Sequence, residues 1–395
     1  SRSKIRLEPG QTIQSVLDRV EADATIEIPS GNYNEEIEIH KPVTLSAIGG
    51  TVNLAGKGEG DTVLSRAEYF KIEGFNITQQ MSKSGCALNI AGGYANIVNC
   101  TVNSPLLSSI NVSSNSKAYI DSCTVFGSHN PNINTEGDSF VFVNKCKIYR
   151  SETYGILTNG NSKVIINGCE IYDIDSNAVS TAENSAVYLK DSKIYKTKNS
   201  GFETASTAKS YVENCNFSSI DACGVCANAA GQQVVVHHCT FTQCEMAAIK
   251  SSNSAKIRTL SNVYKDIGSN VMIIANDQGV IQCEKDEFEG TCLAGITTFS
   301  NGLIIGHDLN FLNISGSAFL SYTRGQIQVD VANVKDCRGA SINLQDNSVV
   351  KIRNLIVKGG QRANLVVSQG TTGEIIDSVF NSSTTLGAEV TNTSN

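Results

Sequence analysis

The sequence predicts an all-β solenoid, and three observations support this class. Four similar segments follow one another, centred on Cys100, Cys123, Cys146 and Cys169, and these cysteines lie 23 residues apart. The chain is rich in Asn, Ser, Thr, Val and Ile and contains 33 Gly, a composition typical of short strands and turns. A repeat in the low twenties indicates coils that stack on one another. We call the cysteine site of each repeat the ladder position; it continues as Ser192, Cys215, Cys239, Ser261 and Asp286, with Val, Ile or Phe two residues later.

Composition and charge exclude several classes of protein. The 395 residues carry a formal net charge of −7 without any Lys/Arg cluster, which argues against a nucleic-acid partner. No apolar run approaches the length that crosses a bilayer, so we expect no membrane association.

The cysteines predict a compartment. Thirteen is an odd number, and many of these residues alternate with Val or Ile as small buried side chains do. We therefore predict reduced thiols in a core and favour an intracellular, cytoplasmic protein, with secretion as the alternative. The chain starts Ser-Arg-Ser-Lys, without an initiator Met or a signal peptide, which suggests a segment of a larger protein.

The chain is predicted to contain one repeat domain between short ends. Apolar residues at 13, 16, 17 and 20 have helical spacing, so residues 1–22 are expected to form a cap with one short amphipathic helix. Residues 23–388 are expected to form about 15 coils of 22–24 residues, each with about three strand pieces such as 156–158, 163–166 and 169–171. Residues 389–395 are expected to form a frayed polar tail.

The stretch Thr-Ile-Glu-Ile-Pro-Ser-Gly-Asn-Tyr-Asn-Glu-Glu-Ile-Glu-Ile, residues 25–39, adds a family resemblance. It resembles the opening of pectate-lyase-like right-handed parallel β-helices, and the later coils are similar to that family's parallel β-helix (CASH) repeats. The resemblance implies a right-handed parallel β-helix. Because this fold hosts lyases, hydrolases and non-catalytic binding domains, the resemblance says little about activity.

The motifs that could carry chemistry favour no catalytic or metal site. Cys223 and Cys226 form a C-x-x-C near His237-His238, but these residues are expected at different corners of a coil, whereas zinc needs converging ligands. Hydrolases of the resembling family, of the polygalacturonase type, have paired aspartates one coil after the position of Glu136 and Asp138. This sequence has none there, so Glu136 and Asp138 are interpreted as a solvated turn. The Gly306-His307-Asp308 motif lies about seven coils away. We predict no catalytic residue, no metal and no cofactor.

The best candidate binding site is a column of aromatic residues three places after the ladder position. Four rings on successive coils should stack about 4.8 Å apart on the outer surface; they are Phe126, Tyr149, Tyr172 and Tyr195, followed by Ser218, Thr242 and Tyr264. Such a column either stabilises neighbouring strands or forms a binding surface. We call the first four residues the ring strip.

These observations favour a non-catalytic scaffold that presents an extended face to a protein partner. The first alternative is a polysaccharide lyase or glycoside hydrolase acting on an acidic polysaccharide. The second is a non-catalytic glycan-binding module that uses the ring strip, although the absence of Trp weakens both sugar hypotheses.

Overall fold

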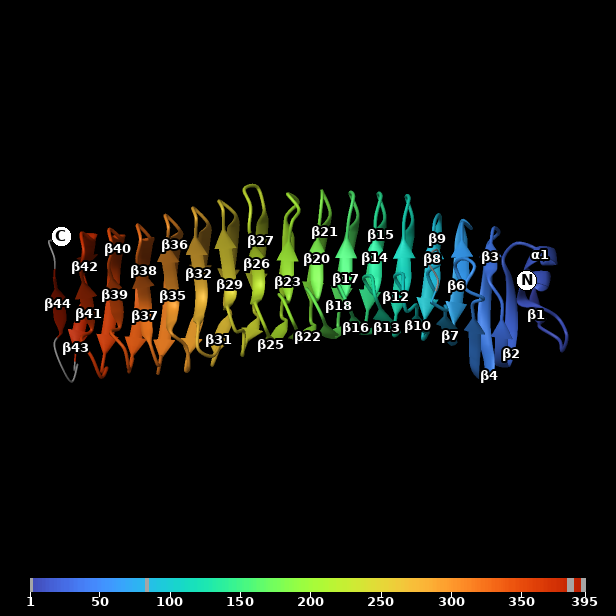
Figure 1. Ribbon diagram of the computed structural model, residues 1–395, viewed down its shortest axis with the longest axis horizontal. Coiled ribbons are helices and arrows are strands. Elements are labelled where there is room, and N and C mark those ends of the chain that lie inside the picture. The colour runs from blue at the N-terminus through green and yellow to red at the C-terminus, as the bar shows by residue number, and fades with distance from the viewer. Residues whose placement is uncertain (1–2, 82–84, 382–386, 392–395) are drawn as a thin grey trace. The chain divides into compact units, whose positions relative to one another are not determined.

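The computed structural model describes residues 3–81, 85–381 and 387–391, and within them the chain is an all-β parallel solenoid with one short helix (Figure 1). This confirms the predicted fold class. The chain divides into two compact units, Ser1–Lys198 and Asn199–Asn395, which we call the first and the second unit. None of the described helices is long and apolar enough to cross a membrane.

The first unit begins with the predicted cap. Helix α1 (Ile13–Arg19) starts after Thr12, whose side chain accepts a hydrogen bond from the Ser15 N–H. The Glu35 carboxylate accepts from the N–H groups of Ile13 and Gln14 at 2.8 and 3.1 Å. The helix packs its buried residues Ile13, Val16 and Leu17 toward the first coil. A strand that was not predicted, β1 (Lys4–Arg6), pairs with β2 (Ala24–Asn34).

Each coil of the first unit contains a base strand followed by two flank strands, as the three predicted pieces require. The base strands are β3 (Ile37–Ile39), β5 (Val63–Ser65), β8 (Leu88–Ile90), β11 (Ile110–Val112), β14 (Ile133–Thr135), β17 (Ile156–Thr158) and β20 (Val179–Thr181). The first flank strands are β6 (Tyr69–Glu73), β9 (Tyr94–Val98), β12 (Lys117–Asp121), β15 (Phe140–Asn144), β18 (Lys163–Asn167) and β21 (Ala186–Lys190). The second flank strands are β7 (Phe75–Thr78), β10 (Thr101–Asn103), β13 (Thr124–Ser128), β16 (Lys147–Ser151), β19 (Glu170–Ile174) and β22 (Lys193–Thr197). Near the cap, β2 and β4 (Val43–Ala55) are longer and pair with each other.

The second unit repeats this plan. Its base strands are β23 (Phe202–Thr204), β26 (Cys223–Ala227), β29 (Ala247–Ser252), β32 (Val271–Asn276), β35 (Ala294–Phe299), β37 (Ser317–Ser321), β39 (Ile342–Leu344), β41 (Leu365–Val367) and β44 (Ala388–Val390). Its first flank strands are β24 (Ser210–Glu213), β27 (Gln233–His237), β30 (Lys256–Leu260), β33 (Val280–Glu284) and β42 (Thr372–Ile376). Its second flank strands are β25 (Asn216–Ile220), β28 (Thr240–Phe241), β31 (Val263–Lys265), β34 (Glu287–Glu289) and β43 (Val379–Asn381). Three long strands span both flanks: β36 (Leu303–Leu312), β38 (Gln326–Lys335) and β40 (Val349–Lys358).

The core consists of columns of inward side chains that alternate with outward ones along each strand. Val164 and Ile166 of β18 pair with Val141 and Val143 on one side and with Val187 and Leu189 on the other, as predicted, and all six are buried. At the start of the predicted tail, Glu389 and Val390 belong to β44, which pairs with β41. Residues 392–395 of that tail lie outside the described residues.

The ladder position has a hydrogen-bonding role in addition to packing. The residue before it turns the chain between the two flank strands with a positive φ, as at Lys145 (52°) and Asp191 (51°). The N–H that follows the turn finds its acceptor in the ladder side chain of the next coil. The Cys146 N–H donates to Cys169 Sγ at 3.4 Å, and the Cys169 N–H donates to Ser192 Oγ at 3.1 Å. This explains why sulfur- and oxygen-bearing side chains share the position.

One ladder assignment was wrong. In the second unit the ladder residue after Cys239 is Asn262, whose Oδ1 accepts from the Cys239 N–H at 2.8 Å, whereas Ser261 is the positive-φ turn residue before it (53°). Tyr264 consequently pairs with Phe241 and is buried inside the coil. It does not continue an outer column of rings.

Candidate functional site

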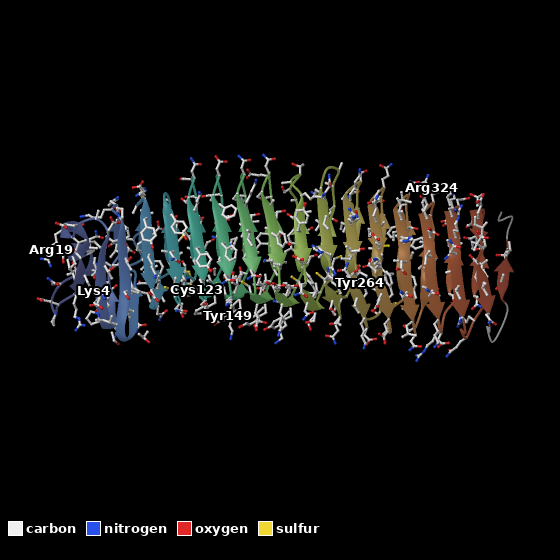
Figure 2. The ribbon with its side chains drawn as sticks, turned by 180° about the vertical axis from the view of Figure 1, so that it is seen from behind. Lys4, Arg19, Cys123, Tyr149, Tyr264 and Arg324 are labelled. Atoms are coloured by element: carbon white, nitrogen blue, oxygen red, sulfur yellow. The ribbon has the colours of Figure 1, made fainter. Side chains whose placement is uncertain are left out.

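The ring strip of the first unit is present as predicted. Tyr149, labelled in Figure 2, lies between Phe126 and Tyr172 in register. Successive ring centroids from Phe126 to Tyr195 are 5.2, 5.0 and 4.9 Å apart, with interplanar angles of at most 10°. All four side chains are half-buried and face outward.

Neighbouring side chains already occupy much of the ring strip. The Arg150 guanidinium carbon lies 5.3 Å from the centroid of Phe126 and 5.7 Å from that of Tyr149. The Tyr195 hydroxyl donates to Glu170 Oε2 at 3.1 Å. Burial is the main cause that raises the pKa of Tyr195 to about 12, and this hydrogen bond is the second. Lys147, Glu170 and Lys193 alternate in charge in register beside the rings. This geometry favours stabilisation of neighbouring strands over binding.

A larger aromatic surface, which the sequence analysis missed, covers the first flank strands of the same unit. Along one column, Tyr94, Lys117, Phe140 and Lys163 are consecutive register partners, so rings alternate with ammonium groups. The four side chains are exposed, Tyr94 by 39% and Phe140 by 42%. The column extends to Tyr69, whose ring centroid lies 5.9 Å from that of Tyr94.

A second, mainly apolar column runs beside it, two residues further along each strand. Tyr119 and Phe142 stack at 5.2 Å, and Ile165 and Tyr188 continue the column in register. Neither Lys117 nor Lys163 forms an ion pair with any described residue. We call the two columns together the aromatic–lysine face; its members are Tyr69, Tyr94, Lys117, Tyr119, Phe140, Phe142, Lys163, Ile165 and Tyr188.

The sequence contains a signal for this face, namely alternation along each strand. In Lys117-Ala-Tyr-Ile-Asp and Phe140-Val-Phe-Val-Asn the first and third residues must point outward if the second and fourth form the core. No single residue type occupies these outward positions on every coil, so no simple repeat reveals the columns.

The carboxylates that the sequence singled out lie on the base side of the coils. Asp138 is exposed and accepts from Asn161 Nδ2 at 3.0 Å, and Glu136 is exposed at the end of β14. Glu136 and Glu183 line one shallow, open depression of about 770 Å³ together with Asn134 and Asn159. The exposure of Glu136 and Asp138 fits the predicted solvated turn.

The cysteines do not form a metal centre in the described part of the chain. All thirteen are free, and no described group of three or more His, Cys, Asp and Glu residues could hold a metal ion. Contact with the thiol of the neighbouring coil, followed by burial, raises the pKa of Cys123, Cys146 and Cys169. A raised pKa keeps these thiols protonated, which suits buried side chains that pack and hydrogen-bond within the core.

In the second unit, Cys223 and Cys226 lie on β26 and are buried, whereas His237 ends β27 on another side of the same coil. Contact with Cys223, followed by burial, raises the pKa of Cys226. His307 of the Gly-His motif lies with its Nδ1 3.7 Å from Asp330 Oδ2, an exposed cross-strand pair.

Comparison with solved structures finds similar folds at low identity. The catalytic domain of a GH87 alpha-1,3-glucanase in complex with nigerose shares 12% identity with a TM-score of 0.47, over 89% of this chain and 66% of that domain. ORF18 of Geobacillus virus E2 shares 12% identity with a TM-score of 0.40, over 78% and 57%. An alginate lyase from Paenibacillus shares 12% identity with a TM-score of 0.32, over 84% and 99%.

The chain thus spans just under two thirds of the glucanase domain, and similarity at this level carries no argument about function. No curated protein sequence matches the chain significantly. The family described as right-handed beta helix region matches residues 63–212 and 154–313, which together cover more than half of the sequence. The chain therefore belongs to the right-handed β-helix family.

Proposed function

We propose that the protein binds an acidic polysaccharide along the aromatic–lysine face of its first unit, without catalysing a reaction there. The observation that carries this proposal is the alternation of Tyr94, Lys117, Phe140 and Lys163 beside the apolar column from Tyr119 to Tyr188. It replaces the protein scaffold that the sequence favoured.

The chemistry of the face suits a charged sugar chain. Flat rings offer apolar surface to the C–H faces of sugar rings, and strands about 4.8 Å apart repeat that surface at the scale of one sugar residue. The unpaired ammonium groups of Lys117 and Lys163 are placed to attract carboxylate or sulfate groups. A protein partner is less well matched, because the centres of protein interfaces are depleted of lysine.

Two carboxylates at the edge of this face are already engaged, whereas Glu68, next to Tyr69, is exposed. Glu73 lies 3.7 Å from Lys71, and Asp121 accepts from Asn144 Nδ2 at 2.8 Å. Glycoside hydrolysis needs one carboxyl group that donates a proton and a second that is free to act on the sugar or on water. This supports binding without hydrolysis at this face.

A panel of acidic and neutral polysaccharides tests the proposal, with binding and release of reducing or unsaturated ends measured with and without calcium. We expect binding to acidic chains only, weakened by salt, and no release of ends. Tyr94→Ala and Lys117→Gln should each weaken binding by about fivefold or more, the equivalent of about 1 kcal/mol. Tyr172→Ala, on the ring strip, is the matched control and should bind as the unmodified protein does.

Three results would contradict the proposal. Equal binding to neutral chains would remove the role of the lysines, and equal losses in Tyr94→Ala and Tyr172→Ala would remove the role of this face. Release of ends would show catalysis and would direct mutagenesis to Glu136 and Glu183, which share a depression on the base side. Absence of polysaccharide binding would return the protein-partner hypothesis to first place.

A further inference from the structure

A cationic depression lies on the first flank strands of the second unit. It has a volume of about 430 Å³ and is formed mainly by β27, β30 and β33. Its lining residues include Lys209, Gln233, Lys256, Arg258 and Gln282. Among the described residues that line it, none is acidic.

Strand register explains why the charges converge. Lys256 and Arg258 point outward from β30 on either side of the buried Ile257. Gln233 is the register partner of Lys256, and Gln282 that of Arg258, so amide groups flank the cations on both neighbouring coils.

Lys209 enters the depression from the turn before β24. Its Nζ lies 6.0 Å from the centroid of Tyr211, a ring that is 36% exposed. An exposed aromatic surface therefore adjoins the charged site, since Tyr211 is the register partner of Val235 in its lining.

A second depression in the same unit contains two cations and one carboxylate, and so provides a comparison. It has a volume of about 310 Å³ and contains Lys351 and Arg353, but Asp330 also lines it. Asp330 is the register partner of Arg353 and accepts from Asn354 Nδ2 at 2.9 Å. The depression of Lys209, Lys256 and Arg258 has no such carboxylate among its described lining residues. An anion that binds there would relieve the repulsion between the cations.

We propose that the depression of Lys209, Lys256 and Arg258 binds a sulfate or phosphate group carried by a sugar. A guanidinium group donates two parallel hydrogen bonds to such an oxyanion, and the two lysines add positive charge beside it. The flanking Gln233 and Gln282 supply further N–H donors, and Tyr211 offers its ring to the sugar. A carboxylate offers these donors two acceptor oxygens, whereas a sulfate or phosphate ester offers three. This site is independent of the polysaccharide face proposed for the first unit.

Calorimetric titration of the full chain at low salt tests the proposal with five probes: inorganic sulfate, inorganic phosphate, glucose 6-sulfate, glucose 6-phosphate and glucuronate. We expect saturable binding of at least one of the two charged sugar esters and weaker binding of glucuronate. A preference between the two esters identifies the source of the oxyanion. Arg258→Gln should weaken binding of the preferred ester by about tenfold or more, since charge-assisted bidentate bonds are lost. The affinity of Arg258→Lys should lie between those of the unmodified protein and Arg258→Gln, because lysine keeps the charge but lacks the planar guanidinium group.

Arg353→Gln is the matched control, because it removes the same group from the depression that contains Asp330. It should change affinity by less than about twofold, as expected for a screened, distant charge. Equal losses in Arg258→Gln and Arg353→Gln, tighter binding of glucuronate than of either ester, or no saturable binding would each overturn the proposal. Unchanged urea-unfolding midpoints in both variants establish that any loss of binding is local.

Discussion

The two units are built from the same coil, but the stacked rings of their second flank strands point in opposite directions, outward in the first unit and inward in the second. In the first unit the second flank strands carry rings outside, from Phe126 to Tyr195, over inward residues such as Ile148 and Ile171. On the second flank strands of the second unit the stacked rings are inside, and Tyr264, labelled in Figure 2, lies between Phe241 and Phe288 with centroids 5.4 and 4.9 Å away. A displacement of one residue along a strand therefore decides whether a ring is available to a ligand or contributes to the core.

The inner rings require space that the outer rings do not. A Cβ added to Gly224 would lie 2.6 Å from the Phe241 ring, and one added to Gly201 would lie 2.6 Å from the Phe217 ring. These glycines lie on or next to the base strands, so a ring from a second flank strand packs directly against the backbone of a base strand. In the second unit, large rings on the second flank strands are thus accommodated by glycines on or next to the base strands.

The largest expected effect comes from removing a ring on each side of the wall. Phe241→Ala should lower the free energy of unfolding by about 3–5 kcal/mol, because it leaves a cavity in a stacked core. Tyr172→Ala should cost less than about 1 kcal/mol, because its half-buried ring contributes only cross-strand contacts. Urea denaturation followed by circular dichroism measures both, and equal costs would show that the inner and outer stacks are energetically equivalent.

A buried carboxylate in the second unit predicts a pH dependence. Asp286 occupies the ladder position, where it accepts hydrogen bonds from Thr259 Oγ1 and from the Asn262 N–H, and burial raises its pKa to about 7. The folded state therefore keeps its proton where the unfolded state has lost it, and stability falls as the pH rises from about 4 to about 7.

Replacement of this carboxyl group by an amide should remove that dependence. At pH 8, Asp286→Asn should stabilise the protein by up to about 4 kcal/mol, and at pH 4 it should have little effect. Glu287→Gln, at the exposed neighbouring position, is the control and should change stability by less than about 0.5 kcal/mol. Urea unfolding at both pH values measures this difference, and a stabilisation that is the same at pH 4 and pH 8 would argue against titration of Asp286.

A methyl group placed under an inner ring should produce a smaller effect. Gly224→Ala is expected to cost about 1–3 kcal/mol, since its Cβ would meet both the Phe241 ring and the Ala248 carbonyl oxygen, 2.7 Å away. Gly60→Ala is the control in the first unit, because the nearest atom to its added Cβ is 4.0 Å away. If thermal unfolding shows the same loss for both variants, glycine flexibility and not space under the ring is the cause.

Sequence periodicity predicts the strands and their register because it reports the inward columns, which tolerate few residue types. It fails where two registers satisfy the same pattern. Ser261 and Asn262 are both polar, and each is followed two places later by an apolar residue, Val263 or Tyr264. Contacts with the neighbouring coil distinguish them, namely the pairing of Tyr264 with Phe241 and the hydrogen bond from the Cys239 N–H to Asn262.

The binding surfaces are harder to predict because outward columns are not constrained to repeat. Tyr69 and Tyr94 are register partners 25 residues apart, outside the predicted 22–24. Lys209, from the turn before β24, and Arg258, from β30, line the same depression although they are two coils apart. They are different residue types, so no repeat in the sequence links them. Such surfaces become visible only when the exact turn lengths are known, and the sequence leaves these undetermined by one or two residues.

The smallest expected effect separates packing from hydrogen bonding at the ladder position of the first unit. Cys169→Ser should cost less than about 1 kcal/mol, because a hydroxyl can still accept from the Cys146 N–H, as Ser192 Oγ accepts from Cys169. Cys169→Ala should cost about 1–2 kcal/mol, because that buried N–H would have no acceptor. If hydrophobic burial alone selected cysteine, alanine would be the better replacement and the order would reverse. Urea unfolding of the two variants under reducing conditions therefore tells which property of the thiol the repeat depends on.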